Sequence, residues 1–326
     1  MRWKPWIALI RPFTLLPPLL GILSGSACAY GSAHNPYASF TWELFGTLLL
    51  GSFCACLMNA ASNIINQVYD LDIDRINKPS RPLCTGEVTR GSALAASWCM
   101  YVFSLAPIWW VVPPPYDQGL LARMRAPWQA HACFWIYMGG LLCTFIYSSP
   151  RLGRTKRFGV WANVTIAAAR GELLKVAGWA MVATVGLWEP WYLGLIFFLF
   201  LLGATSTKDF SDMEGDRQGG CRTLPITYGP RKAAWMIAPS FVLPWLLFPL
   251  GLLLPAPSGG RLLTGNPLLL ALLGAALVLW GSHTVWLLLR NPQELAYTEN
   301  HPSWTEMYGM MMAAQVGLAA AYLLQG

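Results

Sequence analysis

Long apolar stretches separated by shorter polar connections run through the chain from one end to the other. A helix needs about 20 mostly apolar residues to cross a bilayer, and stretches of that kind recur along this sequence. The pattern predicts nine transmembrane helices, at 7–30, 42–68, 92–113, 131–148, 160–185, 190–207, 233–254, 267–289 and 305–325. The predicted fold class is an all-α polytopic membrane protein with a single domain over residues 1–326.

The composition agrees with a membrane protein. Hydrophobic residues make up 55% of the 326 residues, charged residues 11%, and the mean hydropathy is +0.44. These values exclude an ordinary soluble enzyme.

The net charge of +7 is distributed unevenly across the predicted membrane. If the amino terminus is inside, 17 of the 22 Lys and Arg lie on that side: Arg2, Lys4, Arg11, Arg75, Lys78, Arg81, Arg90, Arg151, Arg154, Lys156, Arg157, Lys208, Arg217, Arg222, Arg231, Lys232 and Arg290. The positive-inside rule makes this side cytoplasmic. We therefore expect no nucleic-acid partner, and an integral protein of a bacterial or archaeal plasma membrane with a cytoplasmic amino terminus.

Two polar loops on the predicted cytoplasmic side, at about 69–91 and 208–232, carry repeated aspartates. The first loop contains Asp70 and Asp74, preceded at the same spacing by Asn66, and the second contains Asp209, Asp212 and Asp216. A spacing of three or four places side chains on one face of a helix. Magnesium prefers hard oxygen ligands and is commonly held by carboxylates together with substrate phosphates. Two such faces opposite each other would hold a diphosphate between metal ions.

Basic residues near these acids supply charge for binding phosphate oxygens. They are Arg75, Lys78, Arg81, Lys156, Arg157, Lys208 and Arg217. Acids at helix ends are frequently no more than solvated surface, and a single DxxxD motif would carry little weight. Two copies on the same predicted side favour one paired site.

The motifs resemble the UbiA superfamily of intramembrane prenyltransferases. The stretches NQVYDLDIDRINKPSRPL from Asn66 and KDFSDMEGDRQGGCRTLP from Lys208 carry the resemblance. The RPFT sequence at 11–14 and the YSSP sequence at 147–150, followed by Lys156 and Arg157, extend it over the whole chain. The first motif is similar to homogentisate-type members, and the second to chlorophyll synthase-type and geranylgeranylglyceryl phosphate-type members.

This resemblance implies a bundle of nine helices around a central cavity, capped by the two aspartate loops. It implies transfer of an isoprenoid chain from a polyprenyl diphosphate donor to a hydrophobic or amphipathic acceptor within membrane lipid, with two Mg²⁺ ions as cofactor. The implied catalytic residues are Asp70, Asp74, Asp212, Asp216 and Tyr147. The expected metal ligands are Asn66, Asp70, Asp74, Asp209, Asp212 and Asp216, and the diphosphate-binding residues are Asn66, Arg11, Lys156, Arg157, Lys208 and Arg75.

Three charged residues, Arg170, Glu172 and Lys175, fall inside the fifth predicted span. Charges inside a membrane usually face a cavity and pair with one another. We hypothesise that Glu172 pairs with Lys175, and that Arg170 or Lys175 meets a polar group of the acceptor. A purely structural ion cluster, or a span boundary drawn too deep, would explain the same residues.

Other polar and aromatic residues of the spans have a weaker claim to a role. His283 and Glu306 could act as acid or base, although satisfied polar residues of a bundle are the simpler interpretation. Aromatic faces attract cations, so candidate neighbours of an allylic cation are Tyr101, Tyr137, Tyr147 and Trp161, although ordinary packing accounts for each.

The acceptor stays open between an aromatic or quinone precursor, slightly favoured, a glycerol phosphate lipid and chlorophyllide. Two alternative functions also remain. A terpene cyclase would use the same diphosphate-ionising site without an acceptor. A transporter would use the intramembrane charges as a path, but it gives no reason for two aspartate motifs.

Overall fold

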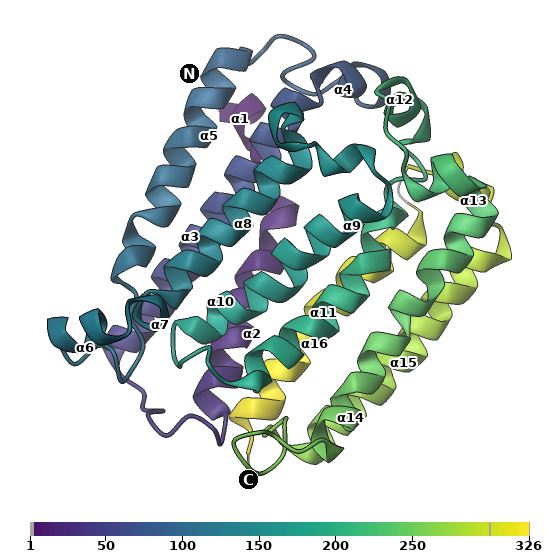
Figure 1. Ribbon diagram of the computed structural model, residues 1–326. Coiled ribbons are helices and arrows are strands. Elements are labelled where there is room, and N and C mark those ends of the chain that lie inside the picture. Colours follow the sequence, from purple (N-terminus) through teal and green to yellow (C-terminus); the bar gives the residue numbers. More distant parts are fainter. Residues whose placement is uncertain (1–2, 300, 326) are drawn as a thin grey trace.

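The computed structural model describes residues 3–299 and 301–325, which fold into a bundle of helices (Figure 1). Its α-helices are α1 (Trp3–Ile10), α2 (Leu16–Gly31), α3 (Trp42–Tyr69), α4 (Leu71–Asn77), α5 (Arg90–Leu105), α6 (Leu120–Arg125), α7 (Pro127–Ala130), α8 (Ala132–Ser148), α9 (Val160–Ala167), α10 (Leu174–Ala180), α11 (Trp188–Ala204), α12 (Met213–Gln218), α13 (Leu224–Ile237), α14 (Leu247–Leu253), α15 (Pro267–Arg290) and α16 (Pro302–Leu323). The prediction of an all-helical protein is confirmed.

Six helical segments of the described residues are long and apolar enough to cross a membrane. They are Pro12–Gly31, Trp42–Tyr69, Arg90–Trp110, Trp188–Thr207, Leu224–Leu253 and Pro267–Arg290. The other three predicted spans also contain helix, in the shorter α8, in α9 with α10, and in α16. The count of nine crossings and their orientation stay predictions, and Arg2, one of the residues assigned to the cytoplasm, lies outside the described residues.

Several predicted spans are interrupted helices rather than continuous ones. The span 233–254 passes from α13 through two 3₁₀ turns, η7 (Ala238–Phe241) and η8 (Leu243–Leu246), into α14. The stretch 7–30 breaks at Arg11, which has a left-handed backbone (φ 53°) between α1 and a 3₁₀ turn η1 (Pro12–Leu15). A residue before proline is disfavoured in the helical conformation, which explains the break. Between α9 and α10 lies a π-helical turn, η5 (Ala168–Leu173), and α10 ends at Ala180, short of the predicted limit of 185.

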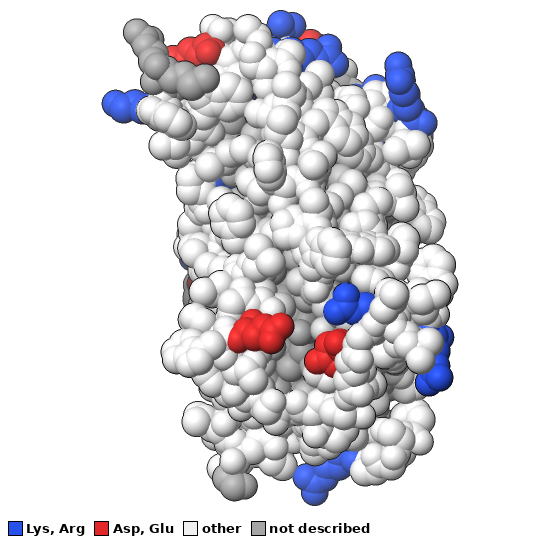
Figure 2. Space-filling model, turned by 90° about the vertical axis from the view of Figure 1, so that its left-hand side faces the viewer, with Lys and Arg blue, Asp and Glu red and all other residues white. Residues whose placement is uncertain are grey.

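The two aspartate loops lie at one end of the bundle. Figure 1 places α4 and α12, the short helices of these loops, at the same end as α1, and it places α6 and α14 at the opposite end. On the side drawn in Figure 2, charged residues gather toward the two ends and leave a largely uncharged band between them. The fold therefore brings both motifs to one face of the protein.

Close helix contacts depend on small residues. Gly25 of α2 and Gly178 of α10 lie against each other's helix: a Cβ atom on Gly25 would be 2.4 Å from the Lys175 carbonyl oxygen, and one on Gly178 would be 2.3 Å from that of Ile22. Small residues let the backbones of membrane helices approach in this way.

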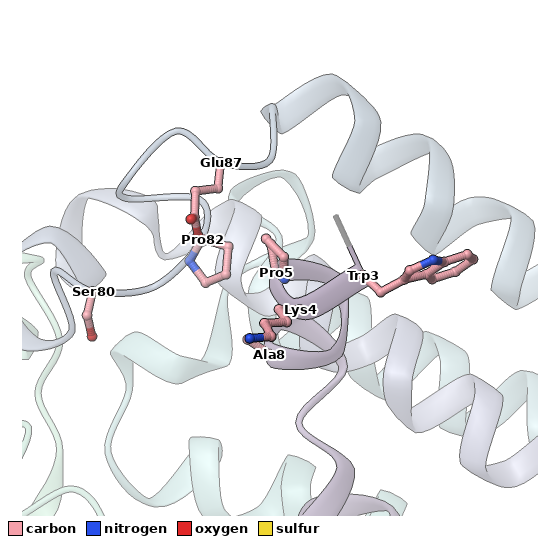
Figure 3. A pocket seen from close by; sticks show the side chains of 7 residues that line it. All are labelled: Trp3, Lys4, Pro5, Ala8, Ser80, Pro82 and Glu87. Atoms are coloured by element: carbon pink, nitrogen blue, oxygen red, sulfur yellow. The ribbon is translucent and has the colours of Figure 1, made fainter. Parts of the chain in front are cut away.

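A surface pocket of about 810 Å³ lies outside the bundle's centre, between α1 and the loop that follows α4 (Figure 3). It is lined by Trp3, Lys4, Pro5, Ala8, Ser80, Pro82 and Glu87, and none of the predicted site residues is among them.

Candidate functional site

A cavity of about 600 Å³ opens between the helices and reaches both aspartate motifs. Most of the predicted site residues line it: Arg11, Asn66, Asp70, Asp74, Tyr147, Lys156, Arg170, Lys208, Asp209, Asp212 and Asp216. Its deeper walls are largely apolar, with Ile136, Leu173 and Met311 among the lining residues. The cavity therefore has a charged mouth and an apolar interior.

One ammonium group connects the two motifs. Lys156, in the loop between α8 and α9, places Nζ 2.6 Å from Oδ2 of Asp70 and 3.4 Å from Oδ1 of Asp216. Asp70 also accepts a 2.7 Å hydrogen bond from Nη2 of Arg154. Both aspartates are buried, so these charge-assisted contacts form away from bulk water.

Asp74 and Asp212 also face cations. Asp74 accepts a hydrogen bond from Nη1 of Arg81. Oδ1 of Asp212 lies 3.1 Å from Nζ of Lys78, which also contacts Oε1 of Glu299 at 3.0 Å. Each motif thus supplies two carboxylates that are held by Lys or Arg.

One side chain of the first aspartate loop, that of Asn77, joins it to the backbone of the second. Asn77, at the end of α4, donates from Nδ2 to the Asp212 carbonyl at 3.0 Å and accepts from the Gly215 N–H at 2.9 Å. A Cβ atom at position 215 would lie 2.5 Å from the Asn77 side-chain oxygen, so only glycine permits this approach. The contact fixes α4 against α12, and with them the four aspartates.

Two arginines at the site have a strained backbone. Arg11 (φ 53°) and Arg154 (φ 44°) are the non-glycine residues with positive φ in the described part of the chain. Such conformations cost energy and tend to occur at functional sites. The Arg11 turn is supported by Asn63, whose Nδ2 donates to the Ile10 carbonyl at 2.9 Å and to Oγ1 of Thr14 at 2.8 Å.

Burial and mutual repulsion change the protonation of the acids. Burial, and next the charge of Asp216, raise the pKa of Asp209 to about 8. Burial likewise raises the pKa of Asp74 and of Asp216, although Arg81 and Lys156 act against it. Burial alone would lower the pKa of Lys156, but Asp70 and Asp216 hold it well above its ordinary value. The ammonium is therefore charged throughout the physiological range.

Four predicted site residues do not line the cavity as described: Arg75, Arg157, Glu172 and Lys175. Arg75 pairs with Asp72 on the exposed face of α4 (3.1 Å), and Arg157 is exposed next to Lys156. Neighbours in sequence point to opposite sides here, so proximity along the chain misled the assignment of both.

The predicted pair between Glu172 and Lys175 is wrong. Lys175 is 1% exposed and donates from Nζ to Ser24 and Gln315, with the Phe197 ring 4.6 Å from Nζ. Glu172 faces α11, where a Cβ atom on Gly194 would lie 3.0 Å from its Cγ. The π-helical turn shifts the register of side chains between them, which sends the two charges in different directions.

The remaining candidate residues fall into two groups, those that line the cavity and those that do not. Tyr137 and Tyr147 line the cavity, whereas Tyr101 and Trp161 are absent from its described lining. His283 and Glu306 lie outside that lining and contact each other at 3.1 Å. Arg154, which pairs with Asp70, is a site residue absent from the prediction, because it lies outside the Lys156-Arg157 pair that carries the family resemblance in this loop.

The oxygen atoms of these side chains are of the kind that suits magnesium. Within residues 3–299 and 301–325, however, no three His, Cys, Asp or Glu side chains converge as a preassembled metal cluster. Lysine and arginine side chains stand against the carboxylates instead. The donor set fits Mg²⁺, provided that these cations release the carboxylates when a ligand binds.

Fold and site together define a helical membrane protein whose central cavity has paired aspartate motifs at its mouth. The model of the UbiA prenyltransferase family matches residues 19–297. The chain belongs to this family.

The chain is similar in sequence to named members of this family and similar in fold to solved structures. The chain is 29% identical over 239 residues to the chloroplastic chlorophyll synthase of Avena sativa, covering 72% of this chain and 57% of that protein. It is 31% identical over 235 residues to the digeranylgeranylglyceryl phosphate synthase of Pyrococcus abyssi, covering 72% of each. A UbiA homolog from Archaeoglobus fulgidus bound to GPP and Mg²⁺ has a TM-score of 0.68 at 20% identity, covering 98% of this chain and 99% of that one. The protein has the fold of that homolog, and it spans little more than half the length of the chlorophyll synthases.

Proposed function

We propose that this protein is a magnesium-dependent intramembrane prenyltransferase that moves an isoprenoid chain from an allylic polyprenyl diphosphate to an acceptor. The observation that carries the proposal is the position of Lys156 between Asp70 and Asp216 at the mouth of the cavity. This arrangement suits a diphosphate at the charged mouth and a prenyl chain along the apolar wall.

Magnesium would be held by Asp70, Asp74, Asp212 and Asp216, assisted by Asn66 and Asp209, and would supply charge stabilisation for the diphosphate oxygens. Two ions, one for each motif, suit this distribution of carboxylates. When such a ligand enters, the ammonium and guanidinium groups now paired with aspartates can turn to the phosphate oxygens.

The chain's own residues would then assist bond cleavage. In the reaction, the bond between the allylic carbon and the diphosphate oxygen breaks, and the diphosphate leaves with the electron pair. Lys156, Arg81 and Arg154 would neutralise the charge that develops on it. The acceptor atom bonds to the allylic carbon and loses its proton. The apolar wall below the mouth keeps water from the cation, and the rings of Tyr137 and Tyr147 face the same space.

The named relatives do not single out one acceptor class. A chlorophyll synthase and a digeranylgeranylglyceryl phosphate synthase give no particular support to the aromatic or quinone acceptor favoured by the first motif. We retain all three acceptor classes, and we place the nine predicted crossings around the cavity with its mouth on the cytoplasmic side.

A direct test incubates the purified full-length protein with prenyl diphosphates of several lengths and a panel of acceptors, with and without Mg²⁺. We expect magnesium-dependent diphosphate release and a prenylated acceptor identified by mass. A cyclic hydrocarbon formed without acceptor would instead identify a terpene cyclase. If no donor releases diphosphate under any condition, the enzymatic proposal is wrong and transport becomes the leading explanation.

A further inference from the structure

A short helix stands out from the side of the bundle at the end opposite the aspartate motifs. It is α6 (Leu120–Arg125), in the connection between α5 and α8, and Figure 1 shows it beyond α7 and outside the long helices. None of its residues is buried, and it lines neither of the two pockets described above. Packing against the bundle therefore does not explain the residues that α6 carries.

Three large apolar side chains of α6 share one face and are open to the surroundings. They are Leu120, Leu121 and Met124, which are 74%, 64% and 68% exposed. Successive residues of an α-helix are about 100° apart, so these three lie within one sector of about 100°. Trp128, in the following helix α7, is exposed as well. A contiguous exposed apolar patch marks a surface that meets a partner or a membrane.

Two arginines border this apolar face. By the same helical geometry, Arg123 lies next to the edge formed by Leu120, and Arg125 lies next to the edge formed by Leu121. Within the described residues, neither guanidinium has a carboxylate within 4.0 Å. Nε of Arg123 is covered, yet it has no hydrogen-bond partner in that part of the chain. An apolar face bordered by cations is typical of helices that lie in the plane of a membrane interface, because the long cationic side chains reach the headgroups.

Tryptophans beside α6 indicate that it lies at the level of the membrane boundary. Trp109 and Trp110 end the turn after α5, η2 (Pro107–Trp110), and Trp128 and Trp135 belong to α7 and to the first turn of α8. All four are exposed, and the ring centroid of Trp135 lies 4.7 Å from that of Trp128 and 6.4 Å from that of Trp109. Tryptophan is enriched where the hydrocarbon of a bilayer meets its headgroups. At this level the apolar face of α6 can enter the acyl chains while its arginines stay among the headgroups.

We propose that α6 is an interfacial helix that binds phospholipids of the leaflet opposite the aspartate motifs. Its apolar face lies among the acyl chains, and Arg123 and Arg125 bind headgroup phosphates, since a guanidinium can form two parallel hydrogen bonds to a phosphate. Two cations without carboxylate partners favour a lipid of net negative charge, such as phosphatidylglycerol, over zwitterionic phosphatidylcholine. The inference does not depend on the prenyltransferase function.

The test places the photoreactive residue p-benzoylphenylalanine at one position of the full-length protein in nanodiscs of phosphatidylcholine and phosphatidylglycerol, and identifies the cross-linked adducts by mass. We expect Leu121→p-benzoylphenylalanine to cross-link lipid, with phosphatidylglycerol adducts about fivefold or more above their share of the bilayer, the usual contribution of one cation near an anionic surface. Ala122→p-benzoylphenylalanine is the matched control. It lies on the opposite side of the same helix and should give little lipid adduct.

Charge variants of the protein with the photoreactive residue at Leu121 test the two arginines. Arg123→Gln combined with Arg125→Gln should bring the phosphatidylglycerol adducts down to their share of the bilayer, whereas cross-linking to lipid should persist because the apolar face is intact. Arg261→Gln removes an exposed cation from the loop between α14 and α15 at the same end of the bundle, and it should leave the enrichment unchanged. Each variant should melt like the wild type, because α6 has no buried residue.

Absence of lipid adducts from the Leu121 position, or equal adducts from the Leu121 and Ala122 positions, overturns the interfacial placement of α6. A cross-link from the Leu121 position to a second copy of the chain overturns it as well, because the apolar face would then be a protein interface. Enrichment of phosphatidylglycerol that persists without both arginines overturns their role in binding headgroup phosphates.

Discussion

Asp70 and Asp216 belong to different aspartate motifs, yet both contact the same ammonium group, that of Lys156, at 2.6 and 3.4 Å. The lysine comes from a third segment, the loop between α8 and α9. Three distant parts of the chain are thus joined by one side chain at the cavity mouth. This relationship makes Lys156 the most informative single position for mutation.

Lys156→Gln should lower the rate of diphosphate release by about 100-fold or more, the typical effect of removing one preorganised group that stabilises developing negative charge. The measurement is turnover at saturating donor and Mg²⁺. Arg157→Gln is the matched control, because that neighbour is exposed and absent from the described lining. Equal losses in both variants would show that the loop as a whole matters, and would contradict a specific role for Lys156.

The Mg²⁺ concentration needed for activity should rise when a carboxylate on the cavity side of α4 is removed, and should stay unchanged when one on its exposed side is removed. Asp74→Asn removes a carboxylate that lines the cavity, so we expect the Mg²⁺ concentration for half-maximal activity to rise about tenfold or more, as for other losses at a metal site. Asp72→Asn removes a carboxylate from the exposed face of the same helix, where it pairs with Arg75, and should have little effect. Removal of divalent ions with a chelator should abolish activity in each enzyme, and added Mg²⁺ should restore it. Activity that survives chelation would exclude the metal.

The stability of α16 should fall in acid because of His301. This residue caps the helix by accepting the Ser303 N–H at Nδ1, and burial lowers its pKa below the ordinary 6.5. The folded protein therefore prefers neutral His301, and its contribution is present above about pH 6.5 and is lost as the pH falls below that value. A protonated ring can no longer accept at that nitrogen and places positive charge at a helix amino terminus.

We expect the melting temperature in detergent to fall between pH 7.5 and pH 5.5, with a contribution from His301 of about 1 kcal/mol, the usual cost of losing a helix cap. His301→Asn keeps a capping side chain that does not titrate, so its melting temperature should depend less on pH over this range. Identical pH profiles for the two proteins would assign the acid sensitivity to other groups.

The sequence predicts the chemistry of the site better than its geometry. Spacings of three and four identify Asp70, Asp74, Asp212 and Asp216 as members of two faces, because helical periodicity is a local property. The apolar stretches likewise locate the six long apolar helices, although the segment Leu224–Leu253 begins nine residues before the predicted start at 233. Both depend only on neighbours along the chain.

What the sequence does not predict is which loop cation turns inward. Arg154 reaches Asp70 from a left-handed backbone conformation, while Arg157 faces solvent three residues later. The divergence of Arg170 from Lys175 depends similarly on one π-helical turn. Such local departures are determined by tertiary packing, and an ideal helical or loop pattern gives no sign of them.

Gly215→Ala tests the junction between the two aspartate loops. The new methyl group would lie 2.5 Å from the Asn77 side-chain oxygen, so the Asn77 amide must give up its two hydrogen bonds to the second loop or α12 must move away from α4. Either change loosens the arrangement of the four aspartates. We expect at least a tenfold loss of turnover, comparable with other small displacements of catalytic groups, and a melting temperature close to wild type. Gly91→Ala, at a helical position with open space around it, is the control and should be active. Full activity of Gly215→Ala would mean that the spacing of the loops is not critical.

Glu189 tests the opposite end of the bundle, where it joins four segments. This buried carboxylate accepts hydrogen bonds from Ser32 Oγ (2.5 Å), Tyr322 OH (2.5 Å) and the Thr264 N–H (2.8 Å). Glu189→Gln replaces one acceptor oxygen by a donor, which leaves a buried group unpaired at a cost of about 1–3 kcal/mol.

The melting temperature of Glu189→Gln should therefore fall by several degrees, whereas turnover measured well below it should stay near wild type, because the cavity mouth lies at the other end of α11. Glu43→Gln, an exposed acid in the first turn of α3, is the matched control and should melt like the wild type. If Glu189→Gln instead loses turnover at an unchanged melting temperature, the two ends of the bundle are coupled during the reaction, and the separation of stability from catalysis assumed for this protein is wrong.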